Sequence, residues 1–159
     1  MEDAIRKQLV TMLEGKGSHI PFSSAIRKFP LELAGKKIRN LHHTAWSLVY
    51  HLQVAQRDIL EFSRNPDYES PEYPGGYWPA SLKPASPKQW RSTIQAIVRD
   101  LAEMIALVRN PHHDLFMPFP WGDGQNLFRE ATVLAGHNSY HIGQLVDIRM
   151  LLGVPVRDW

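Results

Sequence analysis

The amino-acid sequence predicts an all-α protein with four main helices, and two observations carry this prediction. Four segments have apolar residues at three- and four-residue spacing, which is the period of an amphipathic helix. Long connections rich in proline, glycine and aromatic residues separate these segments. Neither the segments nor the connections contain a credible strand. Because a chain of 159 residues has the size of one ordinary domain, we expect a single domain over residues 1–159.

The first predicted helix covers residues 2–13, with Ile5 and Leu9 on its apolar face, and glycines follow it as they follow many helices. The connection over residues 18–40 contains one short helix over 23–29 and is otherwise irregular. A connection of this length more often carries functional residues than serves only as a linker.

The second predicted helix covers residues 42–62, HHTAWSLVYHLQVAQRDILEF, and has no glycine or proline inside it. The loop that follows, NPDYESPEYPGGYWPASLKPA, contains several prolines and a glycine pair, which forbid regular structure. Its four aromatic residues offer apolar surface, so we expect this loop to pack on the helices.

The third predicted helix runs from Pro87 to about residue 109, with Ser86 as its N-cap and Gln89 placed to return the capping hydrogen bond. A second aromatic, proline-rich loop follows. Asn126 then caps the fourth predicted helix over residues 127–152, which a glycine and a proline close.

Composition excludes several classes of site. The chain has no cysteine, so a disulfide framework, a zinc-thiolate cluster and a cysteine nucleophile are all excluded. The net charge is only +2, and the densest basic cluster, Lys36, Lys37 and Arg39, indicates a solvated loop and not a nucleic-acid surface. Since no long apolar run and no signal-like segment is present, we expect a cytoplasmic protein without a membrane anchor.

The stretch AGHNSYHIGQL in the fourth helix carries the main functional signal. His137 and His141 are four residues apart, so both project from one helix face and can bind one ion together. Gln144 lies on that face, and Glu130 lies on it approximately, seven residues before His137. Both are candidate outer partners that orient an imidazole, as is Asp58 on the second helix.

A catalytic metal site needs a third protein ligand, and the pattern favours His51. It is the one remaining histidine in the interior of a confident helix, among apolar residues as a core-facing residue would be. Two further pairs of histidines are adjacent in the sequence, so the two side chains of each pair would point apart on a helix. We interpret these residues as solvated or capping: His42, His43, His112 and His113. The alternative is that His137 and His141 are a chance pair, on the surface or satisfied in the core.

The chain resembles the DinB/YfiT-like superfamily of four-helix-bundle proteins. The resemblance spans nearly the whole chain, through TAWSLVYHLQVAQRDIL, the loop NPDYESPEYPGGYWP and HNSYHIGQLVDIRMLLG. It implies a divalent metal, zinc or nickel, held by one histidine of the second helix and two of the last, which here are His51, His137 and His141. It also implies a homodimer, and several superfamily members are thiol-dependent transferases or isomerases that use bacillithiol or mycothiol.

Three neutral imidazoles leave the ion its full charge, which lowers the pKa of a bound water from about 15.7 toward 7, or that of a coordinated thiol. Because the chain has no cysteine, a thiol would arrive on a small cofactor such as bacillithiol. The candidate walls of a substrate pocket are the aromatic residues Trp46, Tyr77, Trp78 and Trp121, although such residues also cap the ends of helical cores.

The sequence therefore favours a metal-dependent hydrolase or thiol S-transferase that acts on a small molecule. The alternative is a non-catalytic dimeric bundle that binds a metal or a stress-related ligand, and a nucleic-acid binder ranks last. Gly136 and Gly143 each cost the helix about 1 kcal/mol relative to alanine. We expect close helix packing at both glycines, within the chain or across a dimer.

Overall fold

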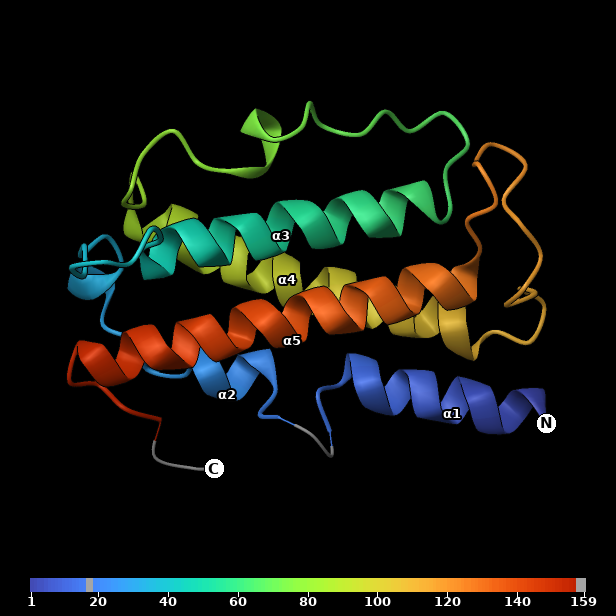
Figure 1. The fold of residues 1–159 in the computed structure, drawn as a ribbon, viewed down its shortest axis with the longest axis horizontal. Helices are drawn as coiled ribbons and strands as arrows, with labels where there is room; N and C mark the ends of the chain where they lie inside the picture. Colours follow the sequence, from blue (N-terminus) through green and yellow to red (C-terminus); the bar gives the residue numbers. More distant parts are fainter. Residues whose placement is uncertain (17–18, 157–159) are drawn as a thin grey trace.

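The computed structural model of the chain describes residues 1–16 and 19–156 (Figure 1). Its α-helices are α1 (Glu2–Leu13), α2 (Phe22–Ile26), α3 (Ala45–Phe62), α4 (Pro87–Arg109) and α5 (Leu127–Leu151), with short 3₁₀ helices η1 (Leu31–Leu33) and η2 (Gly75–Tyr77). The described residues contain no strand, so the predicted all-α class is confirmed.

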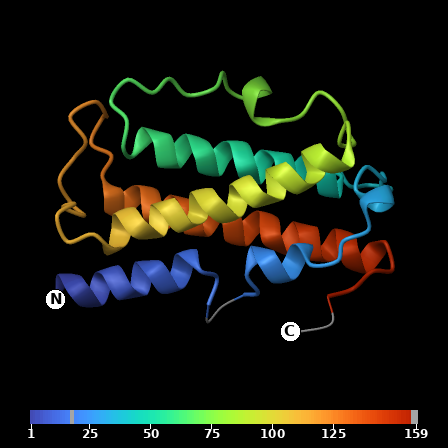
Figure 2. The same cartoon turned by 180° about the vertical axis from the view of Figure 1, so that it is seen from behind.

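The long helices α3, α4 and α5 lie lengthwise against one another, and α1 and α2 follow each other along one side of them (Figures 1 and 2). α1 packs on α4 and α5, whereas α2 packs on α5. Packing between α3 and α5 is what brings the second and fourth predicted helices into contact. None of the helices among the described residues has the length and apolar character needed to cross a lipid bilayer.

Local capping sets the helix starts. The Thr44 hydroxyl accepts a hydrogen bond from Ser47 N, and the Ser47 hydroxyl accepts one from Thr44 N, which forms a reciprocal capping box. α3 therefore begins at Ala45, and the predicted start at residue 42 is wrong because this box ends the extended segment before it. Gln89 Oε1 accepts from Ala85 N at 2.6 Å, one residue earlier than the predicted return bond.

Two other boundaries differ from the predicted ones. α2 covers Phe22–Ile26 and not 23–29, because Arg27 leaves the helical region and Lys28 has a φ of 53°. α5 ends at Leu151, with Leu152 as its C-cap and Gly153 at a φ of 74°. The predicted bounds of α1 and α4 are confirmed.

The apolar core has two parts, one at each end of the molecule. Leu48, Leu52 and Leu145 belong to the part beside α2 and are almost fully buried. Each buried leucine of this kind contributes about 1.5–3 kcal/mol by leaving water. These leucines flank the predicted metal ligands in the sequence, so they fix the backbone of α3 and α5 behind the site.

Gly136 and Gly143 do not pack closely on any helix of the same chain. Both are exposed, and a Cβ atom added at either would meet nothing within 4 Å. The expectation of close packing within the chain is therefore wrong, because the glycines lie on the outer face of α5. The same face exposes Tyr140 and Met150, at 65% and 54%.

Candidate metal centre

The three predicted ligands come together in the structure. His51 of α3 and His137 and His141 of α5 each offer one ring nitrogen, and these nitrogens lie within 4.8 Å of one another. The Nε2 atoms of His51 and His137 are 3.0 Å apart. Two imidazole nitrogens bound to one tetrahedral zinc ion are separated by about 3.3 Å, given bonds of about 2.0–2.1 Å. The cluster therefore needs only a small adjustment to hold such an ion.

Helix geometry explains this convergence. His137 and His141 are one turn apart on α5, and their ring centroids are 4.5 Å apart. Both rings face His51, whose centroid is 4.9 Å from that of His137 and 4.7 Å from that of His141. His141 is only 7% exposed, whereas the other two rings are partly accessible. Three protein ligands in a partly open site leave a coordination position for a further molecule.

Two of the rings are oriented through their outer nitrogen. His51 Nδ1 lies 3.2 Å from the carbonyl oxygen of Tyr77, and His141 Nδ1 lies 2.7 Å from Gln144 Oε1. Since both partners are acceptors, each Nδ1 carries the proton and each Nε2 keeps its lone pair for a metal. Gln144 thus lies where the shared helix face led us to expect it.

The third ring leaves two polar atoms without partners. His137 Nδ1 and Asn138 Oδ1 are both buried and form no hydrogen bond. The direction of the Asn138 amide is fixed by a chain of bonds: Gln56 Nε2 donates to the Ile97 carbonyl at 2.6 Å, so Gln56 Oε1 accepts from Asn138 Nδ2 at 2.9 Å. Asn138 must therefore present an oxygen, which is an acceptor.

These unpaired atoms match the needs of a bound metal. Without an ion, the contact between His137 Nε2 and His51 Nε2 requires a proton on one of them, and His51 already carries its proton on Nδ1. The proton of His137 then sits on Nε2, and its Nδ1 faces no donor. With a metal on Nε2, the proton moves to Nδ1, where the neighbouring Asn138 oxygen can accept it. Residues of this kind fit a divalent metal.

Burial keeps the three imidazoles neutral. Loss of water contact lowers the pKa of His51 and of His137 to about 4, and it lowers the pKa of His141 as well. The Tyr77 carbonyl raises the pKa of His51, and Gln144 raises that of His141, as hydrogen-bond acceptors do, but burial outweighs both. Neutral imidazole is the form that binds metals, so the ligands are ready near pH 7.

A stack of three rings closes one side of the cluster. Trp78 lies flat against His51, with centroids 4.0 Å apart, and its other face lies against His43 at 4.3 Å. Trp78 was predicted as a wall of the pocket, whereas His43 was interpreted as a solvated or capping residue. The sequence-based interpretation assumed that residues 42 and 43 are helical, so that their adjacent side chains would point apart. Both residues precede α3, so this geometry does not apply to His43. Burial also lowers the pKa of His43.

The loop over residues 63–86 runs back along α3 and carries this wall (Figure 1). Its anchor is Tyr77, whose hydroxyl donates to Asp58 Oδ2 at 2.6 Å, seven residues after His51 on α3. Asp58 forms no hydrogen bond to an imidazole of the cluster in the part of the chain that the structure describes. It holds Tyr77, and the carbonyl of Tyr77 in turn orients His51.

The other predicted site residues lie elsewhere. Trp46 is 1% exposed and packs on Tyr50 and Trp90 in the core. Trp121 stacks on Phe119 and donates to the carbonyl of Phe62, about 16 Å along α3 from His51. Glu130 is buried, pairs with Arg129 and has a pKa raised by burial. None of the three forms a hydrogen bond or ring contact with the triad in the described part of the chain.

Comparison of the chain with protein-family models, with curated proteins and with solved structures found no match. Membership of the DinB/YfiT-like superfamily therefore stays a prediction from the sequence motifs.

Proposed function

We propose that this chain is a divalent-metal-dependent enzyme of the DinB/YfiT-like superfamily. The observation that carries the proposal is the convergence of His51, His137 and His141, with two Nδ1 atoms already held by acceptors. This arrangement leaves Nε2 of His51 and of His141 free to bind an ion. The partly open side of the cluster is where a substrate would enter.

An ion held there supplies Lewis acidity, which lowers the pKa of a coordinating water or thiol toward neutrality. The reaction is hydrolysis or transfer of a low-molecular-weight thiol to an electrophile. A thiol would come from a cofactor such as bacillithiol, because the chain has no cysteine of its own. Zinc and nickel are the proposed metals, since imidazole ligands suit both.

The chain's own residues have defined tasks in this proposal. Tyr77 and Gln144 hold the protons of two rings on Nδ1, which keeps the ligands in the productive tautomer. Trp78 and His43 exclude water from one side of the cluster. Tyr140 packs beside His141, with ring centroids 4.9 Å apart, and supports that ring from the outer side of α5.

The proposed protein is a cytoplasmic homodimer. Support for a second copy comes from the outer face of α5, where Gly136 and Gly143 lie beside the exposed side chains of Val133, Tyr140 and Met150. Glycines in a helix allow a partner helix to approach closely. The packing gained in this way offsets the lower helix propensity of glycine.

The experiment compares metal-free protein with protein loaded with zinc or nickel. One assay follows hydrolysis of p-nitrophenyl acetate, and the other follows conjugation of bacillithiol to 1-chloro-2,4-dinitrobenzene. We expect metal loading to accelerate one of these reactions in the wild type and to have no effect in His141→Ala. Stoichiometric metal binding with no acceleration in either assay would instead favour the alternative, a non-catalytic bundle that binds a metal or a ligand.

A further inference from the structure

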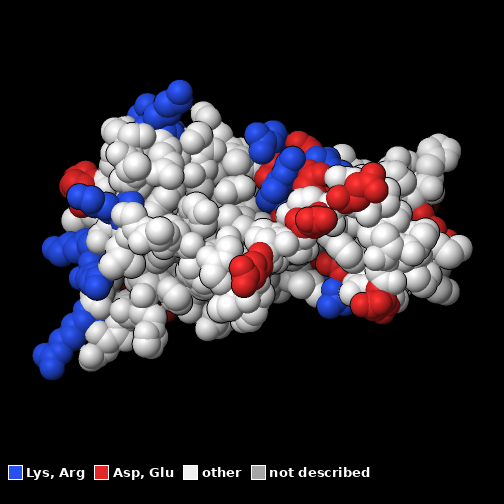
Figure 3. Space-filling model, turned by 90° about the horizontal axis from the view of Figure 1, so that it is seen from above, with Lys and Arg blue, Asp and Glu red and all other residues white. Residues whose placement is uncertain are grey.

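Basic residues gather at one end of the molecule. Segments 19–50 and 79–98 contain one acidic residue, Glu32, and eight cationic ones: Arg27, Lys28, Lys36, Lys37, Arg39, Lys83, Lys88 and Arg91. Figure 3 shows blue side chains concentrated at the end where α3 begins and red ones over the other half. The modest net charge of the whole chain conceals this separation, because acidic residues at the opposite end balance it.

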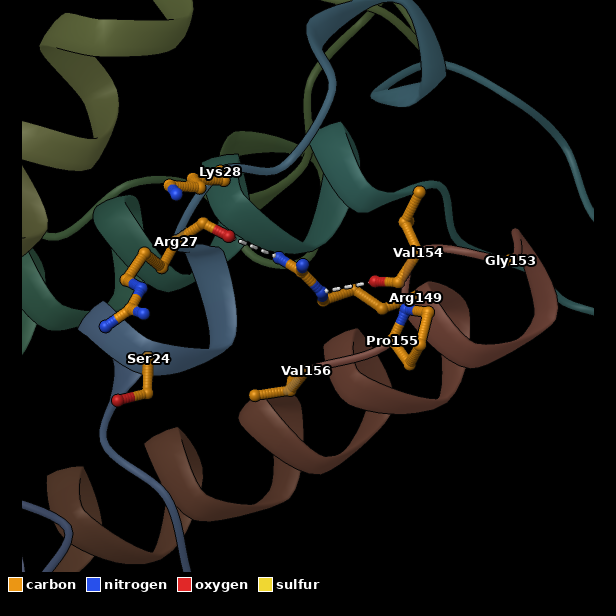
Figure 4. A pocket seen from close by; sticks show the side chains of 8 residues that line it. All are labelled: Ser24, Arg27, Lys28, Arg149, Gly153, Val154, Pro155 and Val156. Carbon is orange, nitrogen blue, oxygen red and sulfur yellow. Dashed lines mark hydrogen bonds between the residues drawn. The ribbon is translucent and has the colours of Figure 1, made fainter. Parts of the chain in front are cut away.

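A pocket of about 360 Å³ lies at this basic end, between α2 and the segment that follows α5 (Figure 4). Three cationic residues line it, Arg27, Lys28 and Arg149, together with Ser24. Val154, Pro155 and Val156 form an apolar wall. The pocket is separate from the metal centre, since Arg149 lies about 12 Å along α5 from His141.

Arg149 is the unusual residue of this pocket. It is only 5% exposed, yet its guanidinium forms no ion pair with any carboxylate in the part of the chain that the structure describes. Nε donates to the Val154 carbonyl at 2.9 Å, and Nη1 donates to the carbonyls of Ala25 and Arg27, both at 3.0 Å (Figure 4). Nη2 takes part in none of these bonds.

A buried cation without a counter-charge is costly, and carbonyl dipoles offset only part of that cost. The pKa of Arg149 is accordingly lowered by burial. The three hydrogen bonds to backbone carbonyls hold the guanidinium in one orientation. The guanidinium therefore loses little conformational entropy when an anion binds. A guanidinium with a free edge recognises oxyanions in a defined geometry.

Lys28 adds a second observation at the rim. Its φ of 53° lies in the left-handed region, which a lysine adopts rarely and at a cost of about 1–3 kcal/mol. Such conformations persist where surrounding structure imposes them, often at binding sites. Lys28 is exposed and forms no ion pair with another described residue, so its ammonium is available to a ligand.

We propose that this pocket is a second binding site, which takes a phosphate-type oxyanion through Arg149 and Lys28. The apolar wall leaves room for the organic part of a phosphorylated small molecule. The same phosphate chemistry occurs on the headgroup of an anionic lipid, and the test distinguishes these two sources. The site neither uses the metal ligands nor depends on the proposed reaction.

The test is calorimetric titration of the full chain with sodium phosphate, at an ionic strength kept constant with sodium chloride. We expect saturable binding with one phosphate per chain. Lys28→Gln should weaken it about threefold to fivefold, as loss of an exposed charge contact does. Arg149→Gln should weaken it about tenfold or more, because the buried guanidinium is the main contact. Lys37→Gln removes the same charge from the same end and should leave the affinity within about twofold.

Because Arg149→Gln also removes hydrogen bonds that hold the chain together, the comparison of Lys28→Gln with Lys37→Gln keeps the test decisive if that variant does not fold. Equal weakening by Lys28→Gln and Lys37→Gln would overturn the proposal, since it would show general charge attraction. Phosphate that binds no better than chloride would also overturn it. Retention on phosphatidic acid vesicles but not on phosphatidylcholine vesicles, reversed by free phosphate, would identify a lipid headgroup as the source. Phosphate binding without vesicle retention would identify a free small molecule.

Discussion

The Nε2 atoms of His51 and His137 lie 3.0 Å apart although 86 residues separate them in the sequence. Two neutral imidazoles at this distance share one proton, and a divalent ion can take its place. The relationship depends on the packing of α3 against α5, which buried leucines on both helices maintain. It is therefore a property of the fold and not of a local motif.

The first prediction concerns the pH dependence of the metal-free protein. Burial lowers the pKa of His51 and of His137 to about 4 in the folded state, whereas an unfolded histidine titrates near 6.5. Between these values the unfolded state binds more protons, so the free energy of unfolding falls as the pH falls from about 6.5 to about 4. Urea unfolding at pH 7 and pH 5, with a chelator present, measures this loss. His137→Gln should lose less stability over the same interval, and an equal loss would contradict the assignment.

The second prediction concerns Gln144. Gln144→Leu removes the acceptor of His141 Nδ1, and we expect metal affinity to fall about 10- to 100-fold because the ring loses its orientation. Gln144→Glu retains an acceptor at the same position and serves as the matched control. Competition with a chromophoric chelator measures both affinities. Equal affinity of the leucine variant and the wild type would show that Gln144 plays no part in the site.

The third prediction concerns Asn138. Asn138→Leu leaves Gln56 Oε1 buried without its donor, which should destabilise the protein by about 1–3 kcal/mol. It also removes the acceptor proposed for His137 Nδ1, so metal affinity should fall about tenfold or more. Gln56→Leu interrupts the same chain of bonds but leaves the Asn138 oxygen in place, so we expect it to lower stability more than it lowers metal affinity. A stability loss with unchanged metal binding in Asn138→Leu would restrict Asn138 to a structural role.

The fourth prediction concerns the loop that covers the site. Tyr77→Phe removes the hydrogen bond to Asp58, whose other carboxylate oxygen already has no partner. We expect a loss of about 1–3 kcal/mol and faster proteolysis within residues 63–86. Tyr73→Phe is the matched control, because Tyr73 is 84% exposed. Similar proteolysis rates in the two variants would show that Tyr77 does not anchor the loop.

The helices and the triad were predictable because their signals are local or periodic. Ser86 and Asn126 mark helix starts, and the spacing of His137 and His141 places both on one face. The path of the loops was not predictable, because it depends on contacts between distant residues such as Tyr77 and Asp58. The sequence therefore could not tell which aromatic residues lie beside the histidine cluster. Trp78 contacts His51, whereas Trp121 packs elsewhere.

The role of His43 shows the same limit. Its position relative to Trp78 depends on a loop that returns from the far end of α3, and nothing in the dipeptide of adjacent histidines indicates that. The separation of basic and acidic ends was likewise hidden. Lys83 and Lys36 are far apart in the sequence, and their segments meet through the close approach of Lys83 to Gly35 and the hydrogen bond from the Thr44 hydroxyl to the Leu82 carbonyl.

The most direct test of the central claim is metal content per chain, measured by plasma mass spectrometry on protein purified without a histidine tag. We expect about one equivalent of zinc or nickel in the wild type and in His112→Ala, an exposed histidine outside the cluster. His137→Ala should contain almost none while keeping its helical content. Equal metal in His137→Ala and the wild type, or no metal in either after zinc or nickel is added, would contradict the metal centre.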